Sequence, residues 1–203
     1  MAKLTKNQKH IQAVLDLATA ADVVQGKGWY ESAFAIAGAL AVNYGVSFKK
    51  AAGVLAALSP RNKWERNVID AEKIIAAYAA AGSEAAEEIK VCTFSSNKAK
   101  AIRILELRDV EASAPDIANI LSGPKLREFF NCIIGLEDVC IDGHAYAIWF
   151  GERVTLANVP SIGVKLRRAI KADYIAVAEA NGLKAYEVQA ITWVAWRRLH
   201  DVA

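Results

Sequence analysis

Apolar residues recur three and four positions apart along almost all of the 203 residues, whereas alternating β-branched runs are scarce. This spacing places apolar side chains on one face of an α-helix, and a half-buried strand would need strict alternation instead. Alanine, the residue with the highest helix propensity, is abundant. The sequence therefore predicts an all-α protein with helices over residues 6–25, 28–44, 48–58, 62–81, 95–107, 114–121, 125–134, 143–150, 161–181 and 185–200.

Short local signals set several of these boundaries. Gly45 and Gly182 are typical C-terminal stops of helices. Asn62 followed by Glu65 predicts a capping box at the start of a helix. Residues 79–88 are the best candidate for a mobile surface turn.

The size and composition of the chain suit one compact domain or two small lobes that share a cleft, since 54% of its 203 residues are hydrophobic. The order of the expected helices favours one lobe over residues 48–121 and a second over residues 1–47 plus 122–203. A cleft between helical lobes is a common ligand site.

The charge is mildly basic, with a formal net charge of +3 and a pI of about 8.7. Basic residues come in short groups: Lys49-Lys50, Arg61/Lys63/Arg66, Lys98/Lys100/Arg103, Lys125/Arg127, Lys165/Arg167/Arg168/Lys171 and Arg197-Arg198. A fold that collected these groups on one face would bind phosphates. Each group taken alone is more typical of the solvated face of a helix.

The cysteines and the N-terminal segment point to an intracellular protein. Cys92, Cys132 and Cys140 lie in apolar surroundings without a Cys-x-x-Cys spacing, which predicts buried thiols in a reducing compartment. No disulfide, metal site, iron–sulfur cluster or other cofactor is therefore expected. No apolar leader and no membrane-length apolar run is present, so we expect a cytoplasmic protein that does not span a membrane.

Asp142 ends the apolar run at residues 139–141 and precedes a helix that opens with Gly143 and His144. Such an aspartate is commonly the N-cap of the helix. It is also a carboxylate at the rim of a buried core, where burial and a helix N-terminus both act on it. The position therefore predicts either a structural cap or a catalytic acid.

A second turn could hold a phosphate near such an acid. The segment from Leu121 to Arg127 has a Gly123-Pro124 turn followed by Lys125 at the mouth of a helix. Backbone N–H groups and cations at a helix start bind anions. The alternative is an ordinary turn with a solvated charge.

Four segments in order resemble the helix-hairpin-helix DNA glycosylase superfamily, which contains endonuclease III and the adenine-mismatch glycosylases. Residues 54–68 resemble the family's apolar helix, its Leu-Ser turn and the helix after it, and residues 94–102 its Asn-x-Lys-Ala helix start, which includes Lys98. Residues 121–125 stand where the hairpin is expected, and Ile141-Asp142-Gly143-His144 resembles the family's Val-Asp-Thr-His. The resemblance spans about half of the chain.

The resemblance implies an enzyme that flips a base out of duplex DNA. Arg61, Asn62 and Lys63 would fill the space that the base leaves. Independently of the resemblance, Trp64 lies among Arg61, Lys63 and Arg66, so it either stacks on a base or packs in the core. Lys98 would contact DNA, and Gly123, Lys125 and Arg127 would grip the backbone at the hairpin. Asp142 would be the catalytic carboxylate, and His144 a proton shuttle, a phosphate contact or a packed side chain.

The chain also departs from the family pattern. The hairpin is degenerate, because its second glycine is missing and Pro124 has entered. The position of the family's lyase lysine falls on Arg127 when counted from the turn and on Lys125 when counted back from Asp142. Residues 186–198 have no counterpart in the repair enzymes, and short phage-type proteins with a glycosylase-like fold are the closer comparison. In that segment, Gln189 and Trp193 share a helix face, so Gln189 reads a base edge or ties two helices together.

The leading hypothesis is cleavage of an N-glycosidic bond in double-stranded DNA that carries modified or damaged bases. A DNA base hypermodification enzyme on the same scaffold is the first alternative. A non-catalytic helical DNA-binding protein is the second, and a helical interaction protein unrelated to DNA is the third. The oligomeric state stays open.

Overall fold

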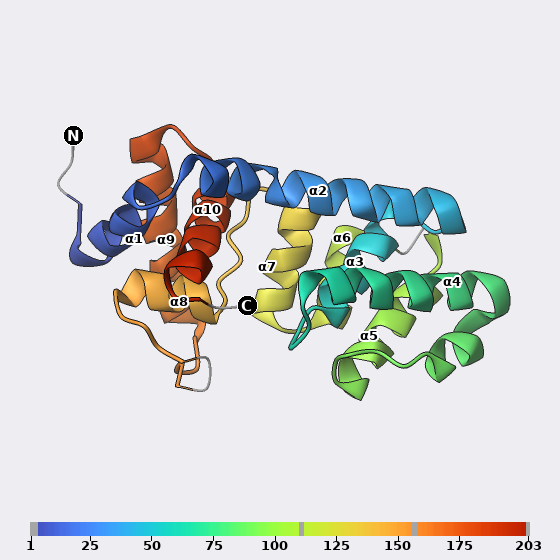
Figure 1. Ribbon diagram of the computed structural model, residues 1–203. Coiled ribbons are helices and arrows are strands. Elements are labelled where there is room, and N and C mark those ends of the chain that lie inside the picture. The colour runs from blue at the N-terminus through green and yellow to red at the C-terminus, as the bar shows by residue number, and fades with distance from the viewer. Residues whose placement is uncertain (1–3, 110–111, 156–157, 202–203) are drawn as a thin grey trace. The chain divides into compact units, whose positions relative to one another are not determined.

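The computed structural model describes residues 4–109, 112–155 and 158–201. Every regular element within these ranges is a helix, and no strand occurs among them (Figure 1). The all-α prediction is therefore confirmed. The helices are α1 (Lys6–Asp16), α2 (Ala20–Tyr44), α3 (Phe48–Leu58), α4 (Trp64–Glu88), α5 (Ser95–Glu106), α6 (Ala114–Leu121), α7 (Pro124–Ile133), α8 (Gly143–Phe150), α9 (Val164–Asn181) and α10 (Ala185–Leu199).

The chain divides into two compact units. The first comprises Met1–Tyr30 and Glu137–Ala203, and the second comprises Glu31–Leu136. The long helix α2 contributes residues to both units. The boundaries differ from those of the expected lobes, because α7 packs on α3 and α6, and Phe34 of α2 packs its ring on Phe48.

In the first unit, α1, α8, α9 and α10 pack around one apolar core. Tyr174, Ile148 and Val188 lie at its centre and are fully buried. Residues 139–141, which lead into α8, are also buried. Burial of this apolar run fixes the place at which α8 begins.

In the second unit, α3 is the central helix and packs against α4, α5, α6 and α7. Residues 50–58 of α3 are buried without exception. Gly53 makes this packing possible, because a Cβ at that position would lie 2.8 Å from a side-chain carbon of Ile117. Such a distance is too short for two carbon atoms, so α3 and α6 need glycine at this contact.

The break between α1 and α2 lies earlier than the sequence predicts. Gly26 and Gly28 lie inside α2, and the chain turns at residues 17–19 instead. Thr19 and Asp22 form the start signal, since each accepts the backbone N–H of the other, at 3.2 and 2.8 Å. Glycine is required at position 26 because α10 lies too close for a side chain: a Cβ there would be 2.5 Å from Cα of Ile191.

The predicted capping box at Asn62 and Glu65 is wrong. Lys63 occupies the N-cap position of α4 without a side-chain cap, and the Asn62 amide is turned toward Asp70. The segment 79–88 is helical apart from a kink at Ala81 and Gly82, where Gly82 has a φ of 78°. Gly45 and Gly182 end their helices with φ of 66° and 64°, as predicted.

Candidate nucleic-acid site

Asp142 is the N-cap of α8 in the first unit. Its Oδ1 accepts the backbone N–H of Ala145 at 2.8 Å, and its carbonyl accepts the N–H of Tyr146 at 3.0 Å. The side chain is half-buried. Among the described residues, only the N–H of Ala145 donates a hydrogen bond to this carboxylate, and it donates to Oδ1. None of these residues donates to Oδ2. A helix N-terminus favours a negative charge at this position.

Helix α9 holds the segment that ends at Asp142. A guanidinium nitrogen of Arg167 donates to the carbonyl of Ile141 at 3.0 Å. One turn further along α9, Lys171 forms an ion pair with Asp138, which also accepts the N–H of Val139 at 2.7 Å. Two basic side chains of one helix therefore fix both ends of the segment 138–141.

Tyr174 lies within the core near this segment. It is completely buried, and its hydroxyl donates to the carbonyl of Ala145 at 3.4 Å. Burial raises the pKa of the Tyr174 phenol above its ordinary value. The hydroxyl therefore stays protonated at neutral pH and supports the first turn of α8.

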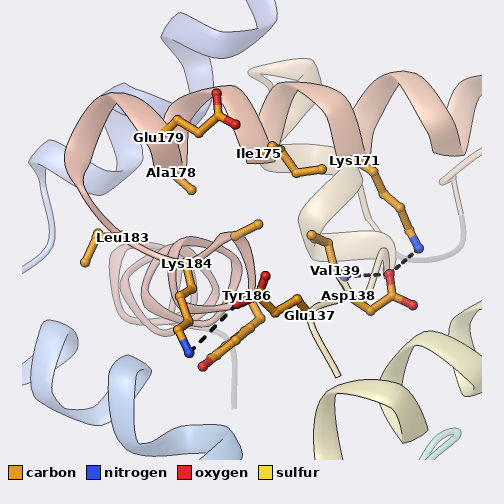
Figure 2. Close-up of a pocket in the computed structure, with 11 residues that line it drawn as sticks. Glu137, Asp138, Val139, Lys171, Ile175, Ala178, Glu179, Leu183, Lys184 and Tyr186 are labelled. Carbon is orange, nitrogen blue, oxygen red and sulfur yellow. Dashed lines mark hydrogen bonds and ion pairs between the residues drawn. The ribbon is translucent and has the colours of Figure 1, made fainter. Parts of the chain in front are cut away.

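A pocket of about 380 Å³ opens beside residues 137–139 (Figure 2). Val139, Ala178 and Leu183 supply apolar lining, and charged side chains of both signs surround them. Figure 2 shows Lys171 reaching Asp138 on one side, and Lys184 lies 3.9 Å from Glu137 on the other. Both lysines therefore have acidic neighbours.

His144, the second residue of α8, packs against α10. The centroid of its ring lies 6.5 Å from that of Trp193, in an edge-to-face arrangement. Both residues are half-buried. His144 is thus placed by an aromatic contact, two residues after Asp142.

In the second unit, the turn at residues 59–63 is clasped to the loop before α5. Asp70 is fully buried and accepts hydrogen bonds from Asn62 at 3.1 Å, from Arg66 at 2.7 Å and from the backbone N–H of Cys92 at 2.8 Å. Burial acts to raise the pKa of Asp70, but these three hydrogen bonds outweigh it and lower the pKa. A buried, ionised carboxylate therefore joins the two loops.

The same turn presents basic residues to solvent. Arg61 has a φ of 55°, in the left-handed region that residues other than glycine rarely adopt, and its guanidinium lies 4.9 Å from the ring centroid of Phe94. Arg61 and Lys63 are exposed, and Phe94 is 48% exposed. Trp64 is half-buried and packs edge-to-face on Phe129, at 6.1 Å between centroids.

Lys98 has a structural partner. Its ammonium donates to the carbonyls of Glu87 and Ile89, the latter at 3.1 Å, where α4 ends. A cation at the C-terminus of a helix stabilises the carbonyls that lack partners there. The side chain that the sequence assigned to DNA contact therefore caps α4.

The degenerate hairpin is a tight turn between α6 and α7. Ser122 has a φ of 60°, Gly123 is the N-cap of α7 without a side-chain cap, and Pro124 is the first helical residue. Arg127 donates from Nε to the carbonyl of Ala118 at 2.8 Å, which ties the two helices together. Lys125 is half-buried at the start of α7.

The predicted site residues fall into both units. Asp142 and His144 belong to the first unit, and the others to the second: Arg61, Asn62, Lys63, Trp64, Lys98, Gly123, Lys125 and Arg127. Within the second unit, residues 61–64 form one turn, and Gly123, Lys125 and Arg127 form another. Among the described residues, no group of three or more His, Cys, Asp or Glu side chains could hold a metal ion. No helix in the same ranges is both long enough and apolar enough to cross a membrane.

A family model described as a family of unknown function, DUF7178, matches residues 1–200. The chain belongs to DUF7178. The match covers both compact units, so Asp142 and the turn at residues 59–63 lie within the DUF7178 region. Neither a curated protein nor a solved structure matches the chain.

We did not predict from the sequence the roles of two residues that organise the site in this DUF7178 chain. Asp70 clasps the turn at residues 59–63, and Arg167 holds the carbonyl that precedes Asp142. Asp70 could have been suspected, because an acid on the apolar side of a helix, four residues after Arg66, is typical of a buried ion pair. Nothing in the sequence around Arg167 indicates its partner.

Proposed function

We propose that this protein is a DNA base-directed enzyme that cleaves an N-glycosidic bond, with Asp142 as its catalytic carboxylate. The proposal rests on the burial and the hydrogen bonding of the Asp142 carboxylate. It is half-buried at the N-terminus of α8 and uses Oδ1 for the cap, and the described residues do not engage Oδ2. A carboxylate held in this way can face a developing positive charge.

The chemistry asked of Asp142 is stabilisation of the sugar as the base leaves. The bond between C1′ and the base nitrogen breaks, the base departs with the electron pair, and a water oxygen adds to C1′. Asp142 would stabilise the oxocarbenium character of the sugar, accept the proton of the attacking water and return it to the departed base. Lys171 and Arg167 hold the segment in front of Asp142, so the carboxylate would be positioned before substrate binds.

Duplex DNA would be engaged by the second unit. A base must leave the stack before its sugar can be reached, at a cost of a few kcal/mol. Arg61 and Lys63 extend from a turn that Asp70 fixes through Asn62, which suits side chains that enter the space left by the base. Lys125 and the N-terminus of α7 would bind a phosphate. The proposal includes the glycosylase-like arrangement of two lobes that the resemblance implies.

One observation favours a second candidate, a DNA-binding protein without catalysis. The hydrogen bond from Ala145 to Asp142 is the bond that a purely structural N-cap makes. In addition, Lys98 and Arg127, two of the expected DNA contacts, bond to carbonyls of the protein. A base hypermodification enzyme on the same scaffold would use Asp142 as the first candidate does, with a second substrate.

Mass spectrometry of treated DNA tests the proposal. Duplexes carrying uracil, hydroxymethyluracil, alkylated bases or oxidised bases are incubated with the protein, and released bases and modified nucleosides are then measured. A glycosylase releases a free base and leaves an abasic site, whereas a hypermodification enzyme produces a heavier nucleoside when its second substrate is supplied. Binding without any mass change across the panel, with and without candidate second substrates, would support the DNA-binding candidate and contradict the enzyme.

A further inference from the structure

One face of α10 carries polar and aromatic side chains that the proposed function has not used. Tyr186, Gln189, Trp193 and Arg197 are spaced three and four residues apart, so they share this face. All four lie in the first unit, together with Tyr30 of α2, whose ring lies 5.8 Å from that of Tyr186. The four segments that resemble the glycosylases, within residues 54–150, do not include this stripe.

Gln189 is a buried amide with a fixed orientation. It is 5% exposed, and the hydroxyl of Tyr30 donates to its Oε1 at 3.0 Å. Among the described residues, this is the only hydrogen bond of the Gln189 side chain. Because the hydroxyl occupies the oxygen, the amide nitrogen presents donors to a further acceptor. Buried polar groups are normally paired, so the amide is suited to a ligand that supplies an acceptor.

The Trp193 ring and the Arg197 guanidinium lie together on the same face of α10, beginning one turn after Gln189. The Arg197 guanidinium lies 4.4 Å from the Trp193 ring centroid, and the Trp29 ring lies 5.4 Å away on α2. Trp29, Trp193 and Arg197 are all half-buried, so part of this group reaches solvent. Unstacked bases bind proteins on aromatic rings and on the planes of guanidinium groups.

Trp193 is connected to the proposed catalytic carboxylate. His144 follows Asp142 by two residues, in the first turn of α8, and its ring contacts Trp193. The side chains of α10 therefore adjoin the helix start that holds Asp142.

We infer that Gln189, Trp193 and Arg197 form a recognition face for an unstacked nucleobase. The base stacks on the Trp193–Arg197 pair, and the Gln189 amide donates to a carbonyl or ring nitrogen on its edge. The inference rests on the proposed function, since it names the residues that would select the base for Asp142. The ligand class is a nucleobase with a hydrogen-bond acceptor on its exposed edge.

Two single-stranded oligonucleotides of equal length test this face: one of thymidine, and one with the same sugar–phosphate backbone but no bases. The measured quantity is the ratio of their affinities for the full chain. The wild type is expected to prefer the thymidine strand, and Trp193→Leu to lose about tenfold of that preference, in the range for one lost base–aromatic stack. Affinity for the base-free strand should not change, because phosphate contacts remain.

Gln189→Glu gives a second reading that does not depend on the stability of the Trp193 variant. The carboxylate still accepts from Tyr30 but no longer donates, so the preference for thymidine should fall. Using the ratio of affinities cancels the added charge. Trp149→Leu is the matched control, because Trp149 belongs to the same unit but bonds to Asp173 and lies on α8. That variant should keep the wild-type ratio.

If both Trp193→Leu and Gln189→Glu keep the wild-type ratio of affinities, the inference is wrong. These side chains would then serve only to pack α10 within the protein. Equal affinity of the wild type for both strands would overturn it as well. This measurement requires no catalysis. If the wild type turns over DNA bases but Trp193→Leu and Gln189→Glu keep the wild-type ratio, the proposed function stands and the inference is wrong. If the ratio falls in both variants but no base is released or modified, the inference stands and the proposed function is wrong.

Discussion

Asp142 and Asp70 both accept backbone N–H groups, but the structure gives them different surroundings. Asp142 is half-buried and accepts one such bond, from Ala145. Asp70 is fully buried, and Asn62, Arg66 and the Cys92 amide all donate to it. An acid with that many donors serves stability, whereas an acid with a spare oxygen near the surface is available for chemistry.

The Asp70 clasp predicts a pH dependence of stability. Because its folded-state pKa is lowered, the ionised carboxylate stabilises the fold above its ordinary pKa, and this contribution is lost as the pH falls through the lowered value. Asp70→Asn should cost about 2 kcal/mol at neutral pH, as expected for hydrogen bonds to a charged group. Urea unfolding at neutral and acidic pH measures both effects.

The comparison has to separate Asp70 from other acids. The hydrogen bond from Arg198 lowers the pKa of Asp22 in the first unit, so the wild type will lose stability in acid at more than one position. The difference between wild type and Asp70→Asn isolates Asp70, and it should shrink as the pH falls. A difference that stays constant down to the acid transition would mean that Asp70 is not ionised in the folded protein.

At the scale of elements, the spacing of apolar residues predicted each of the ten helices found in the described residues, but it misplaced the break between α1 and α2 and both ends of α4. Gly26 and Gly28 suggested a break in sequence, since glycine is a poor helix former. The structure runs α2 through both, because Gly26 lets α2 approach Ile191 of α10. The pair Thr19 and Asp22, spaced as a capping box, was the local signal for the true start.

These two glycines provide a matched pair of substitutions. Gly26→Ala places a methyl group 2.5 Å from Cα of Ile191, so it should destabilise the first unit by about 1–3 kcal/mol through overpacking. Gly28→Ala meets no atom within 4 Å, and it should stabilise α2 by up to about 1 kcal/mol through helix propensity. Thermal unfolding of both variants measures the difference.

Opposite signs for the two glycines would support the packing of α2 on α10. Equal effects at Gly26 and Gly28 would contradict it, because propensity alone acts alike on both. The result also bears on the α10 face, since Tyr30 reaches Gln189 from the same helix.

At the scale of the whole molecule, the sequence shows which side chains carry the charge that a nucleic acid would need, but it does not show the partners of those side chains. The basic groups are all present, but Lys98 bonds to the end of α4, and Arg127 bonds to the end of α6. A sequence shows the charge of a side chain, whereas its partner depends on which helix end lies beside it. The same limit applies to Asn62, whose amide reaches Asp70 and not the start of α4.

Lys125 and Lys98 together give a prediction about the salt dependence of binding. If Lys125 contacts a phosphate, Lys125→Ala should weaken binding to all duplex sequences alike and reduce the slope of log affinity against log salt by about one. Lys98→Ala should leave that slope unchanged and lower the melting temperature, because it removes the cap of α4. Titration of a labelled duplex at several salt concentrations gives both slopes.

Equal slopes for wild type and Lys125→Ala would remove Lys125 from the DNA contacts. A covalent adduct that borohydride traps between the protein and DNA, and that is lost in Lys125→Ala, would give this residue a different role as a lyase nucleophile.

The central claim is that Asp142 acts on the sugar of a flipped nucleotide, and comparing the wild type with Asp142→Asn tests it most directly. Asparagine keeps an oxygen for the N–H of Ala145 and loses the negative charge. With the duplex saturated, wild type should form an abasic or modified product, and Asp142→Asn should form none while keeping its melting temperature and DNA affinity. Product formed by Asp142→Asn at the wild-type rate, or a variant that fails to fold, would contradict the account.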